Sequence, residues 1–109
     1  MTLTLEEERV VRTFREQADA AFPGEILEVW LFGSKARGDA TEDSDIDLLV
    51  VTASDDWRKG DAIRRIGYDL DAEIGCKLSI QVLPIAHVRY LRENRFQFVR
   101  NIQQEGVAI

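Results

Sequence analysis

The amino-acid sequence predicts an α/β (α+β) fold with a small β-sheet flanked by helices. The first observation is the order of its periodic segments: helix, strand, Gly-Ser turn, strand, helix, strand, helix. The second is the length of 109 residues, which suits one domain with a modest core. The third is the composition, since 45% hydrophobic and 31% charged residues are typical of an ordinary globular protein.

The first element is a helix, expected over residues 4–22. Its start matches a capping box, in which Thr4 is followed three residues later by Glu7. Pro23 and Gly24 end it. Apolar residues recur at helical spacing and predict one buried face: Val11, Phe14, Ala18 and Ala21.

Three strands are expected after this helix. Residues 26–32 are almost continuously apolar, which suggests burial on both faces of the strand. Residues 46–51 form the second strand. Residues 77–83 alternate, with Leu78, Ile80 and Val82 on one side, and form the third.

Two further helical regions complete the predicted order. Residues 57–73 form a helix that Gly75 stops, although Gly67 inside it costs about 1 kcal/mol relative to alanine. Pro84 closes the third strand and can occupy the first turn of the next helix. One or two helices then span residues 85–105, with a possible break near Asn94. The cap of the helix over 57–73 is one of three residues: Ser54, Asp55 or Asp56.

Composition excludes several classes of function. The single Cys76 cannot form an internal disulfide, so we expect a reducing, cytoplasmic setting. No segment resembles a signal peptide, and no apolar run approaches the roughly 20 residues of a membrane helix. A net charge of −6 argues against non-specific nucleic-acid binding, which depends on neutralising phosphates.

Two aspartates stand at the start of the second strand. Asp45 and Asp47 are two residues apart in a run that continues as Leu-Leu-Val-Val. Side chains at i and i+2 of a strand point to the same face, so the two carboxylates should project together. Such a pair is suited to a magnesium ion, which takes carboxylates together with phosphate oxygens of a substrate.

A Gly-Ser pair follows directly after the first strand. Gly33 lets the backbone approach a phosphate closely, and Ser34 can cap the short helix whose amide end attracts the anion. Lys35 and Arg37 would add positive charge. These features predict a phosphate-binding turn next to the aspartate pair.

Each of these features also has a purely structural interpretation. The aspartates can be idle charges at a strand edge, although aspartate is disfavoured in strands. The Gly-Ser pair can be only a tight turn, and the two basic residues can be surface charges. A calcium loop beginning at Asp43 is excluded, since it would require glycine and glutamate where the chain has Leu48 and Ser54. A P-loop is excluded because its motif does not occur.

The stretch G-S-K-A-R-G-D-A-T-E-D-S-D-I-D-L-L-V, residues 33–50, resembles the nucleotidyltransferase superfamily that includes DNA polymerase β and kanamycin nucleotidyltransferase. It is similar to the stand-alone minimal nucleotidyltransferase domains of prokaryotes. The motif covers fewer than 20 residues, but a Gly-Ser pair and an Asp-x-Asp at this spacing, between two strands, are specific together. The resemblance implies one minimal domain over residues 1–109, with a small mixed sheet backed by helices in the nucleotidyltransferase fold.

The resemblance also implies an activity. It implies transfer of a nucleotidyl group, AMP, from ATP or another nucleoside triphosphate to an acceptor, with Mg²⁺ as cofactor. Asp45 and Asp47 would be catalytic and hold the metal. The nucleotide would be bound by four residues: Gly33, Ser34, Lys35 and Arg37. Minimal domains of this kind pair with helical HEPN-type toxins, so we expect such a partner, as in a toxin–antitoxin pair, or a homo-oligomer.

One departure from the family pattern leaves an alternative open. Active members carry a third carboxylate on the strand after the central helix, whereas residues 77–83 contain no acid. The positions available for it are Ser79 and Gln81. At 109 residues we also expect no second domain of the kind with which larger members bind an acceptor. The alternatives are therefore a catalytically weak nucleotide-binding antitoxin that sequesters its partner, and a structural subunit that has lost its ligand.

A basic segment near the C-terminus suggests a docking surface. Four arginines between Arg89 and Arg100 face only one acid, Glu93, which gives a local balance of +3 in a chain of −6. Arginine and aromatic residues are enriched at interfaces, and this predicts contact with an acidic partner or a second copy. Alternatively, the arginines pair with acids elsewhere in the chain. The apolar residues of the segment are Tyr90, Leu91, Phe96, Phe98 and Val99.

Overall fold

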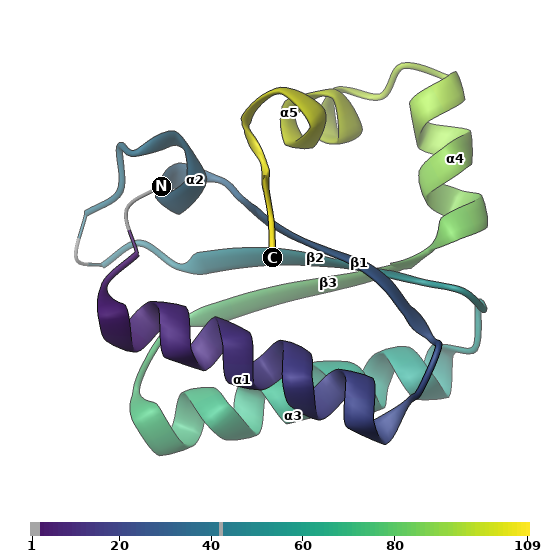
Figure 1. Cartoon of the computed structure of the whole chain (residues 1–109). Helices are drawn as coiled ribbons and strands as arrows, with labels where there is room; N and C mark the ends of the chain where they lie inside the picture. Colours follow the sequence, from purple (N-terminus) through teal and green to yellow (C-terminus); the bar gives the residue numbers. More distant parts are fainter. Residues whose placement is uncertain (1–2, 42) are drawn as a thin grey trace.

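The computed structural model describes residues 3–41 and 43–109, so Glu42 of the motif lies outside the described part. Within that part, four strands form one mixed sheet in the order β3-β2-β1-β4 (Figure 1). The strands are β1 (Ile26–Phe32), β2 (Ile46–Thr52), β3 (Leu78–Pro84) and β4 (Val107–Ala108). The helices are α1 (Leu5–Ala21), α2 (Ser34–Arg37), α3 (Trp57–Ile74), α4 (Ile85–Glu93) and α5 (Gln97–Glu105).

Helices cover both faces of this sheet. α1 and α3 pack beside each other on one face, and α4 and α5 lie over the other (Figure 1). The larger core lies on the α1/α3 side, where Phe14 and Ile63 meet Leu48 of the sheet. A smaller cluster on the other side joins Leu49 with Val88 and other residues of α4 and α5. The α/β fold with a small mixed sheet is therefore confirmed.

β2 is the centre of the sheet. It pairs antiparallel with β1 and parallel with β3, and every residue of it is buried except the half-buried Asp47. A strand covered on both faces must be apolar along its length, so a carboxylate in it lies where the covering stops. The register places Phe32 of β1 and Ser79 of β3 on either side of Asp47.

The local signals for the two long helices are confirmed. In the capping box of α1, the Glu7 N–H donates to Thr4 Oγ1 at 3.1 Å and the Thr4 N–H to Glu7 Oε1 at 2.9 Å. Asp56 caps α3 by accepting from the backbone of its first turn. Gly67 inside α3 has a physical reason, because an added Cβ would lie 1.9 Å from Ile80 Cδ1. Glycine lets this helix approach the sheet closely.

The structure corrects three expectations. β1 is not buried on both faces, since Leu27 is 44% exposed and Glu28, Trp30 and Phe32 are only half-buried. Pro84 ends β3 and precedes α4 as its N-cap, so it is not in the first helical turn. β4 was not predicted, since a strand of two residues has no periodicity to detect. The expected helix break near Asn94 is confirmed. None of the helices in the described ranges is long and apolar enough to span a membrane.

Candidate active site

The aspartate pair lies where β2 emerges from the loop that precedes it. Asp45 is exposed just before the strand, and Asp47 is its second residue. Partial burial and then the negative charge of Asp45 raise the pKa of Asp47, while the positive charge of Arg37 acts in the opposite direction. The two carboxylates are therefore close enough to repel each other.

Gly33 lies directly against this pair. It is the residue after Phe32, which is the β1 neighbour of Asp47 in the sheet register. Its backbone has φ 74° and ψ −158°, a region that is nearly restricted to glycine. A Cβ at this position would lie 2.2 Å from Asp47 Oδ2. The Gly-Ser turn therefore lies directly against the aspartate strand, and glycine is required by both conformation and space.

Ser34 does not cap the short helix α2, contrary to expectation. Gly33 occupies the N-cap position and Ser34 is the first helical residue, with no side-chain cap hydrogen bond. The Ser34 hydroxyl is half-buried and takes part in no hydrogen bond among the residues described. Its hydroxyl is therefore available as a hydrogen-bond donor.

Arg37, at the end of α2, faces several carboxylates. Its guanidinium lies 3.2 Å from Asp39 and 3.6 Å from Glu105 of α5, measured between nitrogen and oxygen. These neighbours raise the pKa of Arg37, first Asp39 and then Glu105. Because Arg37 also lowers the pKa of Asp47, its positive charge lies within electrostatic range of the aspartate pair.

Lys35 is placed differently from the other predicted binding residues. It is 7% exposed, and its Nζ lies 3.0 Å from Glu7 Oε2 of α1. Burial raises the pKa of Glu7, but hydrogen bonds from Thr4 and Lys35 lower it by more. Lys35 therefore fastens α2 to α1, and this placement does not support direct contact with a phosphate.

The third strand offers no carboxylate next to the pair. Ser79 is the β3 neighbour of Asp47, and Gln81 follows two residues later on the same face. Asp71 of α3 is used elsewhere, since its carboxylate accepts from the Leu78 N–H at 3.2 Å. Over residues 3–41 and 43–109, no group of three or more His, Cys, Asp or Glu side chains is arranged to hold a metal.

Two carboxylates still fit a magnesium ion. Mg²⁺ is commonly bound by one or two carboxylates, with substrate phosphates and water completing its coordination. Asp45 and Asp47 supply this donor set, and their mutual repulsion is the electrostatic condition that a cation relieves. The pair fits a metal that arrives with a nucleotide better than a metal held by protein ligands alone.

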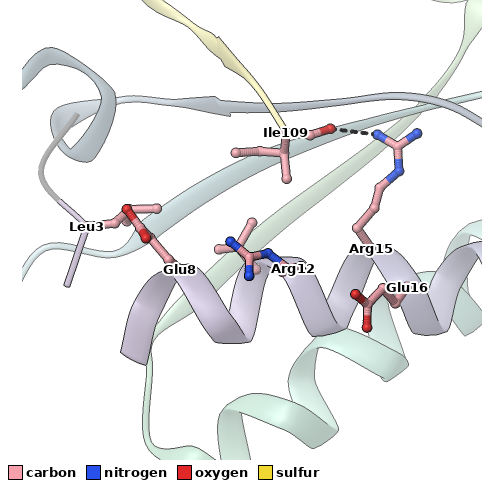
Figure 2. Close-up of a pocket in the computed structure, with 7 residues that line it drawn as sticks. Leu3, Glu8, Arg12, Arg15, Glu16 and Ile109 are labelled. Carbon is pink, nitrogen blue, oxygen red and sulfur yellow. Dashed lines mark hydrogen bonds between the residues drawn. The ribbon is translucent and has the colours of Figure 1, made fainter. Parts of the chain in front are cut away.

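A separate cavity of about 370 Å³ opens between α1 and the C-terminal end of the chain (Figure 2). Arg15 crosses it and donates to the Ile109 carbonyl at 2.9 Å. Its remaining lining is Leu3, Glu8, Val11, Arg12 and Glu16. None of these is one of the residues that the sequence predicts for the site.

Two residues of the site region were missed by sequence reasoning. Glu7 was identified only as a capping residue, and nothing in its spacing connects it with Lys35. Glu105 was treated as the end of a helix, although it reaches Arg37. Both contacts join segments far apart in the sequence, so no local pattern could have revealed them.

Comparison with known proteins identifies the family. Residues 11–109 match the model of the nucleotidyltransferase domain. A protein of Methanocaldococcus jannaschii named "Putative protein adenylyltransferase MJ0604" is 32% identical over 104 residues, covering 94% of this chain and 96% of the relative. A second from the same organism, "Putative protein adenylyltransferase MJ0141", is 25% identical, with 92% and 95% covered.

A solved structure supports the fold. The structure described as "a putative nucleotidyltransferase from Sulfolobus solfataricus" is similar to this chain, with a TM-score of 0.58 and 23% sequence identity. The match covers 92% of this chain and 76% of that one. The mixed four-stranded sheet agrees with this neighbour. On the family match, the relatives and the fold together, the chain belongs to the nucleotidyltransferase domain family, as a minimal, polymerase β-like member.

Proposed function

We propose that the chain is a magnesium-dependent protein adenylyltransferase, which transfers AMP from ATP to a hydroxyl of a partner protein. The relatives named as protein adenylyltransferases support this choice of reaction. The observation that carries the proposal is the contact between the Gly-Ser turn and the aspartate strand, where a Cβ on Gly33 would lie 2.2 Å from Asp47 Oδ2. This contact brings the Gly-Ser turn and the aspartate pair to one place, which supports their joint use in binding phosphate and metal.

In this proposal each residue of the site has a separate task. Asp45 and Asp47 hold Mg²⁺, which when bound neutralises charge on the phosphates. Ser34 donates its hydroxyl hydrogen bond to a phosphate oxygen, and Arg37 adds a positive charge beside it. Lys35 holds the turn in position through Glu7 instead of binding the nucleotide.

The reaction is a displacement at the α-phosphorus. The acceptor oxygen forms a bond to phosphorus while the bond to the β-phosphate oxygen breaks, releasing pyrophosphate and a proton. The site contributes by orientation and charge, because its residues bind the phosphates and fix where the acceptor must approach.

A second candidate is a catalytically weak antitoxin that binds a nucleotide and sequesters its partner. The observation in its favour is Ser79, which occupies the strand position beside Asp47 where an acid would complete the site. In either case we propose a helical HEPN-type protein as the partner, acting as acceptor in the first case and as a sequestered toxin in the second.

The test is label transfer from ATP to a HEPN-type partner protein. ATP labelled at the α-phosphate should label the partner, and ATP labelled at the γ-phosphate should not. The double variant Asp45→Asn/Asp47→Asn should lose at least 100-fold of the rate, an order-of-magnitude expectation for removing a charge-stabilising group. Asp69→Asn, an exposed acid on α3, is the matched control and should act as wild type.

The outcomes separate the two candidates. Label from the α-phosphate that persists in the double variant would exclude the aspartate pair from catalysis. Nucleotide binding and partner binding without any label transfer would favour the sequestering antitoxin.

A further inference from the structure

The turn between α4 and α5 contains a residue that is unusual for its conformation. The Arg95 N–H donates to the Arg92 carbonyl at 3.1 Å and the Phe96 N–H to the Leu91 carbonyl at 3.0 Å. This is the hydrogen-bond pattern of a Schellman motif, in which the left-handed position is usually glycine. Here it is Arg95, with φ 57°, the one non-glycine residue with positive φ in the described ranges. The fold alone would favour glycine at this position.

The arginines around this turn form no ion pairs within the part of the chain that the structure describes. Arg89, Arg92, Arg95 and Arg100 are all exposed, and none belongs to an ion pair among the residues that the structure describes. The chain has 20 acidic residues, so many carboxylates could in principle have paired with these arginines. The alternative interpretation, in which these arginines pair with acids elsewhere in the chain, is therefore not observed among the described residues.

The aromatic side chains of the segment divide into two groups. Phe98 packs edge-on against Phe32 at 5.5 Å between ring centroids, and Val99 is buried, so these two serve the core. Tyr90 and Phe96 are 56% and 46% exposed and contact each other at 6.2 Å. An exposed aromatic pair beside unused arginines has the composition of an interface centre.

We propose that this surface docks an acidic surface of the protein that accepts the nucleotidyl group. The surface, here named the basic corner, is defined by Arg89, Tyr90, Arg92, Arg95, Phe96 and Arg100. The acceptor role rests on the proposed function, whereas the docking itself does not. Charge complementarity selects the partner, because a cluster of exposed arginines favours carboxylates and repels basic surfaces.

The position of the basic corner suits an acceptor. α5 has nine residues and so spans about 13 Å from the corner to its C-terminal end. At that end Glu105 pairs with Arg37 beside the aspartate pair. In Figure 1, α5 runs from the α4 side of the molecule toward α2. A protein docked on the corner can therefore extend over the site.

The first test measures docking without nucleotide. The probe is a fluorescein-labelled helical peptide of glutamate and leucine, with dissociation constants taken from fluorescence anisotropy at low and moderate salt. Arg92→Glu/Arg95→Glu should weaken binding at least tenfold. Arg9→Glu/Arg12→Glu makes the same charge change on exposed positions of α1 and should change binding less than threefold.

A second variant separates function from folding. Arg95→Gly places the residue that the left-handed position favours, so the melting temperature should rise by a few degrees. The same variant should bind the peptide at least threefold more weakly, because it lacks the guanidinium. If Arg95 served only the turn, stability would rise and peptide binding would stay the same, which would overturn the proposal.

Two further results would also overturn it. If both double variants weakened peptide binding equally, peptide binding would depend only on the net charge of the protein. A single-stranded oligonucleotide could also bind more tightly than the peptide and lose its binding in the variants of the basic corner. That result would make the corner a nucleic-acid surface. Failure of the proposed function looks different: AMP transfer is absent while peptide docking persists, and this removes the acceptor role alone.

Discussion

Gly33 is the residue at which backbone conformation and site chemistry depend on each other. Its φ and ψ lie in a region that costs other residues about 1–3 kcal/mol. Gly33→Ala should lower the free energy of unfolding by about that amount. It should also abolish Mg-ATP binding, because the added Cβ displaces the Asp47 carboxylate. Chemical denaturation and titration calorimetry measure the two effects.

Gly24 provides the matched control. It has a positive φ of 77° and no atom within 4 Å of an added Cβ. Gly24→Ala should therefore lose stability through conformation alone and keep its affinity for the nucleotide. Unchanged affinity in Gly33→Ala would reduce the Gly-Ser turn to a structural role.

Asp47 should reduce stability at neutral pH in the absence of ligand. Its pKa is raised in the folded protein by burial and by Asp45, so the folded state holds the proton to a higher pH than the unfolded state. Stability therefore falls as the pH rises through this raised pKa. Asp47→Asn should melt a few degrees higher than wild type at neutral pH and show no difference in acid, where the carboxyl is protonated. A lower melting temperature at neutral pH would contradict this.

At the scale of elements, one carboxylate connects α1 with α2. Glu7 Oε1 accepts from the Thr4 N–H, and Glu7 Oε2 contacts Lys35 Nζ at 3.0 Å. Glu7→Gln keeps an oxygen for the cap but loses the charge beside Lys35. We expect it to lower the free energy of unfolding by about 1.5–3 kcal/mol, the range for a hydrogen bond to a charged group.

The pH dependence of this effect has a defined sign. The pKa of Glu7 is lowered from 4.5, so its contribution is present above that pH and disappears as the pH falls through the lowered value. The difference between wild type and Glu7→Gln in urea denaturation should disappear in the same window. Glu6→Gln is the control, since Glu6 is exposed in the same turn and should change stability by less than about 0.5 kcal/mol. An equal loss in both variants would mean that the contact with Lys35 contributes nothing.

At the scale of the whole molecule, a ligand that binds only the folded state raises the melting temperature by mass action. Mg-ATP at one hundred times its dissociation constant would add about 2.7 kcal/mol. This corresponds to roughly 10–20 °C for a domain of this size, at about 4–8 °C per kcal/mol. Asp45→Asn/Asp47→Asn should show no such shift in differential scanning fluorimetry, and Asp69→Asn should shift as wild type does. Equal shifts in all three proteins would place the nucleotide elsewhere.

Most elements and the family follow from local patterns in the sequence. The capping box at Thr4, the apolar spacing in the first helix and the run after Asp47 are local patterns, and each corresponds to an observed element. A Gly-Ser pair and an Asp-x-Asp at fixed spacing are also local, so the family resemblance could be stated from them and was then confirmed. Both kinds of signal lie within about 20 consecutive residues, where chain connectivity already restricts the geometry.

Which of these residues come into contact depends instead on packing between distant segments. The contacts of Lys35 with Glu7 and of Arg37 with Glu105 join segments far apart in the sequence. The packing of the layers leaves Leu27 of β1 exposed, and β4 pairs with the outer edge of β1 at Trp30 and Leu31. These features depend on how the layers pack, and packing follows from the whole set of side chains together, which no single segment specifies.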